Sequence, residues 1–306
     1  MSGGAQRSGV GRDASPLVRA ALIGLVLLFL ALVLILPMVV VIAEAFARGA
    51  AVAWAAVREP DALSALQLTL LAVAIAVPCN VVFGIAAAWT ITKFDFRGKS
   101  LLVTLIDLPF TVSPVIAGLI LVLVFGVRGW FGGHLEALGV PIIFAVPGIV
   151  LATVFVTFPF VARELLPLME AQGRDHEEAA VSLGAGGLQV FRRVTLPNIK
   201  WGLAYGVILC TARAMGEFGA VSVVSGHIRG RTNTLPLHVE ILYNEYRFAA
   251  AFAVAGLLMA LALLLLLAKW LVEWRGAGEV GRAARRAVQV SEPESHRAVE
   301  PHWSSR

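Results

Sequence analysis

The chain has 306 residues, of which 58% are hydrophobic and only 15% are charged. Soluble domains carry about 25% charged residues, and a water-soluble chain of this length would need more polar surface. The composition therefore excludes a soluble fold, extensive disorder and a disulfide-rich miniprotein, and it favours an integral membrane protein. The formal net charge of +5 is too small to indicate nucleic-acid binding.

Six apolar stretches, each long enough to cross a bilayer as a helix, follow one another along the chain. They cover residues 17–43, 64–90, 101–127, 142–162, 201–226 and 248–271. Lipid offers no hydrogen-bond partners to the backbone, so a spanning segment must be a helix or part of a closed barrel. The sequence lacks the short alternating segments of a barrel. We therefore expect an all-α fold with six transmembrane helices. This membrane domain is predicted over 17–275, between a tail at 1–16 and a disordered tail at 276–306.

The basic residues indicate how the chain is oriented. If the N-terminus is cytoplasmic, the Lys and Arg residues divide 18 to 6 in favour of the cytoplasmic side, and Arg213, inside a span, completes the total of 25. Cytoplasmic segments of membrane proteins carry the excess of Lys and Arg. We therefore expect both termini in the cytoplasm.

The segment 163–200, between the fourth and fifth stretches, is long and polar. Asp175 and Glu178 have the spacing of a capping box, which predicts a short helix from His176 to Leu183. Gly184 is expected to end that helix. A second, amphipathic helix is expected to follow, with one face formed by Leu188, Phe191 and Val194.

This segment resembles the EAA loop of ABC importer permeases. The family pattern is Glu-Ala-Ala, three residues, Gly, nine residues, an aliphatic residue, one further residue and Leu-Pro. The matching positions here are Glu178, Ala179, Ala180, Gly184, Val194, Leu196 and Pro197. An ordinary helical hairpin is the alternative, but it would not require small residues where another backbone could approach closely.

The resemblance implies a type I ABC importer permease fold, in which this loop forms a coupling helix that docks on a cytoplasmic ATPase subunit. The docking residues that it implies are Asp175, Glu178, Ala179, Ala180, Leu183, Gly184 and Phe191.

The chain itself lacks the features of the ATPase. Gly98-Lys99-Ser100 resembles the end of a phosphate-binding loop, but the first glycine of that motif would fall on Lys93. No catalytic set is visible, and the six histidines have no metal-ligand spacing. We expect no catalytic residue, metal or cofactor here, with ATP bound by a partner subunit.

Two ionisable residues within the fifth stretch are candidates for a translocation pathway. Arg213 and Glu217 are four residues apart, so they share a helix face and can pair. They form either a structural salt bridge or part of a positive site for an anion, and Glu217 argues against a bare anion site because it cancels the charge.

The third stretch contains a second pathway candidate. Pro109 and Pro114 are expected to disrupt the helix, and the hydroxyls of Thr111 and Ser113 either satisfy the freed backbone groups or line a cavity. Asp107, just before them, is expected to pair with a nearby arginine.

The segment after the fifth stretch is predicted to be external and basic. His227, Arg229 and Arg231 form either a solvated loop or a docking surface for an oxyanion-loaded binding protein.

A narrower resemblance concerns the substrate. The runs Arg213–Val221, Gly226–Gly230, Thr232–Leu237 and Glu240–Tyr246 look like the sulfate/thiosulfate branch of the family, and Leu108–Pro114 is similar to sulfate and molybdate permeases generally. The resemblance implies a bacterial inner-membrane importer of sulfate or thiosulfate. Its partners would be a second, homologous permease, two ATPase subunits and a periplasmic sulfate-binding protein.

Other functions remain open on the sequence. A molybdate or tungstate importer permease would share the loop, and an amino-acid or phosphate importer permease would share it but differ in the third and fifth stretches. A stand-alone secondary transporter would need no ATPase, and a membrane-embedded enzyme would need a catalytic set.

Overall fold

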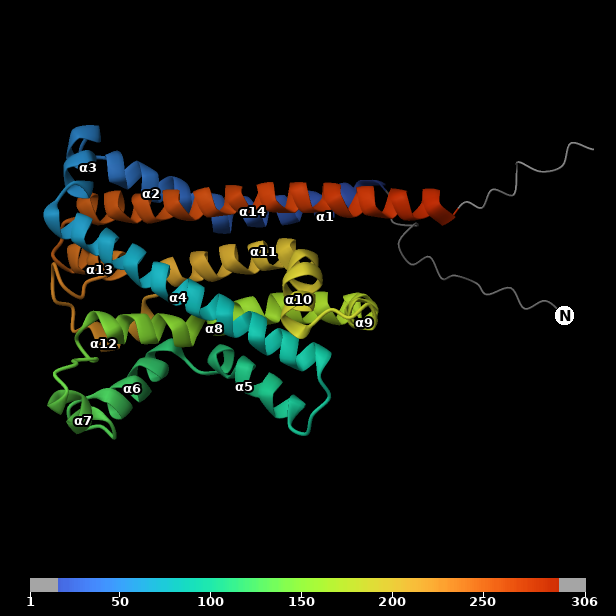
Figure 1. Cartoon of the computed structure of the whole chain (residues 1–306). Coiled ribbons are helices and arrows are strands. Elements are labelled where there is room, and N and C mark those ends of the chain that lie inside the picture. The colour runs from blue at the N-terminus through green and yellow to red at the C-terminus, as the bar shows by residue number, and fades with distance from the viewer. Residues whose placement is uncertain (1–15, 292–306) are drawn as a thin grey trace, which may run out of the picture. The chain divides into compact units, whose positions relative to one another are not determined.

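Helices form every regular element in residues 16–291, the part of the chain that the computed structural model describes (Figure 1). This confirms the predicted all-α class. Within this described part, four helices are long and apolar enough to cross a membrane, namely Leu17–Phe46, Pro60–Lys93, Val146–Gln172 and Phe248–Arg275. They correspond to the first, second, fourth and sixth predicted stretches.

One compact unit joins the chain up to Glu59 with Val239–Leu257. Its first span consists of α1 (Pro16–Leu30), a π-helical stretch (Ala31–Ile35) and α2 (Leu36–Phe46), and α3 (Ala50–Val57) follows. No residue in the most apolar window of this span is buried, so its side chains need lipid or another chain as neighbours. Within this unit, Arg247 makes two bonds to the Glu59 carboxylate, at 3.2 and 2.9 Å.

The second unit joins Pro60–His238 with the chain from Leu258 onward. Its helices are α4 (Pro60–Lys93), α5 (Lys99–Thr111), α6 (Pro114–Phe125), α7 (Gly132–Ala137), α8 (Val146–Gln172), α9 (Asp175–Ser182), α10 (Gly187–Val190), α11 (Leu196–Met215) and α12 (Gly219–Ser225). Two further helices, α13 (Leu235–Asn244) and α14 (Phe248–Ser291), each belong partly to both units.

The core of the second unit forms where α4, α8 and α11 lie side by side (Figure 1). Small residues allow the backbones to come close: a Cβ at Gly84 of α4 would lie only 2.7 Å from Val161 of α8. Close approach at small residues is the usual way for helices to pack in a membrane, where the hydrophobic effect does not drive them together.

The third and fifth predicted spans are not single straight helices. α5 and α6 are separated at Val112–Ser113 and bent by 107°, whereas the helix Gly187–Met215 is bent by 51° from α12. Pro114 explains the first break because proline disfavours the helical conformation of the residue before it, and Ser113 is extended with ψ of 134°. The described residues therefore contain four helices that are able to cross a membrane, or up to six if each bent pair counts as one.

The C-terminal segment differs from the expected disordered tail. The sixth span continues as α14 to Ser291, so the segment predicted to be disordered from residue 276 begins as helix. Its Ala, Arg and Glu residues favour helix and extend one that is already nucleated. The remainder of that tail, residues 292–306, and nearly all of the predicted N-terminal tail lie outside the described residues.

Candidate functional site

The short helix of the EAA-like loop begins one residue earlier than predicted. α9 spans Asp175–Ser182, so Asp175 is its first helical residue and Arg174 takes the capping position without a side-chain cap bond. The prediction that Asp175 caps the helix is therefore wrong. Asp175 and Glu178 still place negative charge in the first turn, where the helix dipole favours it.

The end of α9 is as predicted. Gly184 has φ of +87°, a conformation that glycine adopts without cost. The amide of Gly184 donates to the Val181 carbonyl at 2.8 Å, and the amide of Ala185 donates to the Ala180 carbonyl at 3.0 Å. These two bonds are those of a Schellman motif. A Cβ at Gly184 would meet nothing within 4 Å, so the backbone conformation explains the glycine and the space beside it is open.

Most of the predicted docking residues lie on the surface. Asp175, Glu178, Ala179 and Gly184 are exposed, and Leu183 is 90% exposed. Val181 and Leu188 are also exposed large apolar side chains nearby. Neighbouring exposed apolar side chains on a polar helix are typical of an interaction surface.

Phe191 differs from the other predicted docking residues. Its ring lies 5.3 Å from that of Trp89 on α4, centroid to centroid, and is only partly exposed. Leu188 is exposed, so the expected common face of Leu188, Phe191 and Val194 does not form as one packed surface. The second helix is instead continuous with the fifth span, through a π-helical stretch at Phe191–Thr195.

The contacts that hold α9 in place were not predicted from the sequence. Lys93, the last residue of α4, pairs with Glu177 at 3.0 Å, and Thr195 donates a hydrogen bond to the same Glu177 oxygen at 3.2 Å. Arg174 pairs with Asp95 at 3.1 Å. The signal available in the sequence was the adjacent pair Glu177-Glu178, of which the family pattern uses only the second.

Two helix breaks meet inside the second unit. α6 packs on α12, and a Cβ at Gly219 would lie 2.9 Å from Pro114 Cβ, next to the break in the third span. Thr111 donates its hydroxyl to the Leu108 carbonyl at 2.8 Å, so it satisfies a backbone group at the end of α5. Ser113 is exposed, and its carbonyl accepts the Ala117 amide.

Arg213 and Glu217 form a pair across the second break. Arg213 Nη1 lies 2.6 Å from Glu217 Oε2; the Glu217 side chain is 1% exposed and that of Arg213 is 33% exposed. The other carboxylate oxygen accepts the Ala220 amide at 3.0 Å. The cation thus lies in the last turn of α11 and the anion at the start of α12, the arrangement that both helix dipoles favour. This geometry confirms that the two side chains pair.

Asp107 also pairs as predicted. Arg163 of α8 contacts both of its carboxylate oxygens, at 3.0 and 3.3 Å. This pair joins α5 to α8 on the side of the break nearer the EAA-like loop.

A buried polar cluster that the sequence analysis missed joins α4, α8 and α11. Asn80 is completely buried and donates to Thr157 Oγ1 at 2.8 Å. Its amide nitrogen also lies 3.6 Å from Cys210 Sγ, whereas its oxygen has no hydrogen-bond partner among the described residues. Side-chain hydrogen bonds of this kind join neighbouring helices in membranes.

The predicted basic segment after α12 is exposed but partly neutralised. His227, Arg229 and Arg231 are on the surface, and Arg229 lies 3.9 Å from Asp61. The chain on either side is well anchored, because Thr232 donates to the Ser225 carbonyl at 2.6 Å.

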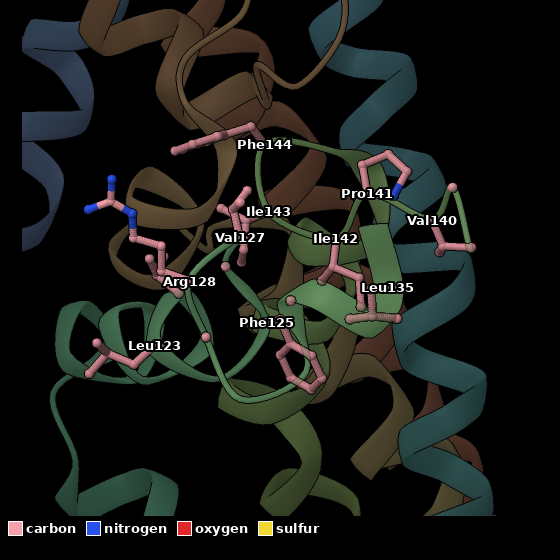
Figure 2. A pocket seen from close by; sticks show the side chains of 15 residues that line it. Leu123, Phe125, Val127, Arg128, Leu135, Val140, Pro141, Ile142, Ile143 and Phe144 are labelled. Atoms are coloured by element: carbon pink, nitrogen blue, oxygen red, sulfur yellow. The ribbon is translucent and has the colours of Figure 1, made fainter. Parts of the chain in front are cut away.

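An apolar pocket lies elsewhere in this unit. It has a volume of about 640 Å³ and is lined by the end of α6 and the chain up to Phe144. Figure 2 shows Phe125, Leu135 and Ile142 gathered around it, with the Arg128 guanidinium directed away from them. A site for an oxyanion needs converging donors, which these apolar walls do not offer.

Apolar spans with breaks and a polar helix exposed beyond their ends are the architecture of a multi-pass membrane transport protein. In the described part of the chain, no group of three His, Cys, Asp or Glu residues could hold a metal ion. The comparisons with known proteins give the family. The model for binding-protein-dependent transport system inner membrane components matches residues 80–275. The chain belongs to this family.

Two relatives and one solved structure show how far the likeness extends. The chain is 50% identical over 262 residues to the sulfate transport system permease protein CysW of Escherichia coli strain K12, covering 86% of this chain and 90% of the relative. It is 38% identical over 244 residues to the sulfate transport system permease protein CysT of Salmonella typhimurium, covering 80% and 88%. A chain of the crystal structure of a bacterial alginate ABC transporter, in complex with an alginate-bound periplasmic protein, matches with a TM-score of 0.69 at 18% identity, covering 82% and 91%. This last match confirms the fold of an ABC transporter membrane subunit.

Proposed function

We propose that this chain is a permease subunit of an ATP-driven importer that moves sulfate or thiosulfate into the cytoplasm. The observation that carries the proposal is the 50% identity to CysW over 86% of the chain, which includes both broken spans and the loop with α9. The exposed acidic residues Asp175 and Glu178 in the first turn of α9 independently support contact with another subunit.

The proposed ATPase contact is the exposed surface of α9 and its C-terminal turn. The docking residues are Asp175, Glu178, Ala179, Ala180, Leu183 and Gly184, and Phe191 supports them from the packed side. Glu178 can pair with a basic side chain of the ATPase, and Leu183 has apolar surface to bury. ATP is bound by the ATPase subunits, so this chain supplies no catalytic residue.

The remaining partners follow from the family and from the exposed surfaces. A second, CysT-like permease would complete the transmembrane pathway, and a periplasmic sulfate-binding protein would deliver the anion. His227, Arg229 and Arg231 form the proposed contact for that protein, because a basic external surface attracts an oxyanion-loaded partner. In this arrangement both termini are cytoplasmic, in keeping with the distribution of Lys and Arg.

The translocation pathway is proposed to pass the two helix breaks. A dianion cannot enter hydrocarbon without polar partners, and helix breaks in transporters expose backbone groups that can serve as such partners. Ser113 contributes an exposed hydroxyl, and the partly exposed Arg213 contributes a guanidinium that Glu217 holds in position. Thr111 supports the break through its bond to Leu108.

The experiment that tests this function is uptake of radiolabelled sulfate by cells that lack this subunit and by the same cells with it restored. Restored uptake that thiosulfate competes for, and molybdate does not, supports the proposal. Preferential competition by molybdate would assign a different oxyanion. Uptake that persists without any ATPase subunit and follows an ion gradient would identify a secondary transporter instead.

A further inference from the structure

The covalent connections of α9 leave its orientation weakly defined. Gly173, with φ of +67°, joins it to α8. Gly184, Gly186 and Gly187 join it to the helix that becomes the fifth span. Because glycine permits many backbone conformations, the contacts of the α9 side chains must fix how this helix is oriented.

Glu177 makes the most enclosed of these contacts. Its carboxylate lies 3.0 Å from Lys93 Nζ, and the two side chains are only 16% and 8% exposed. Thr195 donates to the same carboxylate oxygen. Lys93 also donates to the Gly173 carbonyl. One carboxylate on α9 therefore joins the last residue of α4 to the base of the fifth span.

A second ion pair nearby provides a comparison. Arg174 contacts Asp95 at 3.1 Å, but the Asp95 side chain is 77% exposed. Exposed ion pairs contribute little because water and salt screen them. An enclosed pair such as Lys93–Glu177 differs, since removal of one partner leaves the other charge without compensation.

We propose that Lys93 and Glu177 are positioning residues that make α9 move together with α4. Displacement of α9 by a docked ATPase then reaches α4 through this ion pair, as well as the fifth span through the chain itself. The closest backbone neighbours of α9 are α10 and the π-helical stretch, so long side chains provide the connection to α4. The inference rests on the proposed function, because it assigns a role within the ATPase-coupled cycle.

The test uses the full transporter, with both permeases, the ATPase subunits and the binding protein, in lipid nanodiscs and in liposomes. The variants are Lys93→Met, Glu177→Gln, the charge reversal Lys93→Glu with Glu177→Lys, and the control Asp95→Asn. We expect each single variant of the pair to keep its ATPase subunits but to import about tenfold fewer sulfate ions per ATP, a typical size for coupling between sites. The charge reversal should recover most of that loss, and Asp95→Asn should change the ratio less than twofold.

A second measurement does not depend on the substrate. Spin labels are placed at His176 on α9 and at the exposed Val82 on α4, in a Cys79→Ser background because Cys79 is exposed and Cys210 is buried. The wild-type chain should give one narrow distance distribution that is the same with and without ATP. Lys93→Met should broaden it or make it depend on ATP.

Several outcomes would overturn the inference. An unchanged distance distribution in Lys93→Met would do so, as would an unchanged ratio of sulfate to ATP. If the single variants lose their ATPase subunits and the charge reversal does not restore import, the pair is merely structural. If the wild-type transporter imports no sulfate, the proposed function fails, and the spin-label distances still decide the role of the pair.

Discussion

Replacement of Arg213 by alanine tests whether this residue has a role beyond its pairing with Glu217. In the structure, Glu217 is 1% exposed, and its carboxylate has two contacts, Arg213 at 2.6 Å and the Ala220 amide at 3.0 Å. Arg213→Ala removes the only one of these contacts that carries a compensating charge. A buried carboxylate then remains at the break between α11 and α12.

The size of the effect follows from this geometry. Removal of one partner from a fully buried pair costs about 3–5 kcal/mol. Because Arg213 is 33% exposed, water can reach part of the vacated space, and we expect a loss of about 2–3 kcal/mol. Glu217→Gln should lose only about 1 kcal/mol, since its amide oxygen can still accept the Ala220 amide and the remaining guanidinium is partly hydrated.

The assay is thermal unfolding of the transporter in nanodiscs, together with sulfate uptake in liposomes. The double variant Arg213→Met with Glu217→Gln has no buried charge, so it should be more stable than Arg213→Ala alone. If the double variant is stable but imports no sulfate, Arg213 acts on the anion. If it imports at the wild-type rate, the pair is purely structural.

One result would refute the physical reasoning itself. Should Arg213→Ala and the double variant lose the same stability, the buried Glu217 charge would not be the origin of the loss. The interpretation of the pair as two charges placed at complementary helix ends would then fail with it.

Three further predictions follow from particular residues. Gly184→Asp should fold, because a Cβ there meets nothing within 4 Å and the left-handed conformation costs an aspartate only about 1–2 kcal/mol. Co-purification of the ATPase subunit with this variant should nevertheless fall at least about tenfold. Normal co-purification would contradict a docking role. Asn80→Leu should change the unfolding free energy by less than about 1 kcal/mol. The variant loses one interhelical hydrogen bond, but it also loses an unpartnered buried oxygen, and the two effects oppose each other. A much larger loss of stability in thermal unfolding would mean that a ligand or water occupies the cluster. A cysteine introduced at Arg97 should be protected from impermeant thiol reagents added outside intact cells, and labelling from outside would reverse the proposed orientation.

The sequence predicted those features of the fold that depend on local chemistry. Four apolar stretches form long helices because lipid leaves no alternative for the backbone. Gly184 ends α9 because the Schellman bonds need a positive φ. Asp107 pairs with an arginine because an unpaired carboxylate near the membrane would be costly.

Features that depend on neighbouring helices were harder to predict. The capping-box spacing misplaced the start of α9 by one residue, because Arg174 takes the capping position and no side-chain cap bond forms there. The 107° bend after α5 depends on the packing of α6 against α12, which proline alone does not specify. The Lys93–Glu177 pair joins residues 84 positions apart, so no local pattern could indicate which of the two adjacent glutamates faces inward.

The length of α11 has a mechanical consequence. Within this helix, Arg213 lies 17 residues beyond Leu196, which corresponds to about 26 Å at 1.5 Å per residue. A helix of that length is a lever arm: a rotation of about 5° at its base would carry its far end through about 2 Å. That displacement is comparable to the distance between hydrogen and acceptor in a hydrogen bond. A small rocking movement at the base of α11 is therefore enough to make or break a hydrogen bond of Arg213 at its other end.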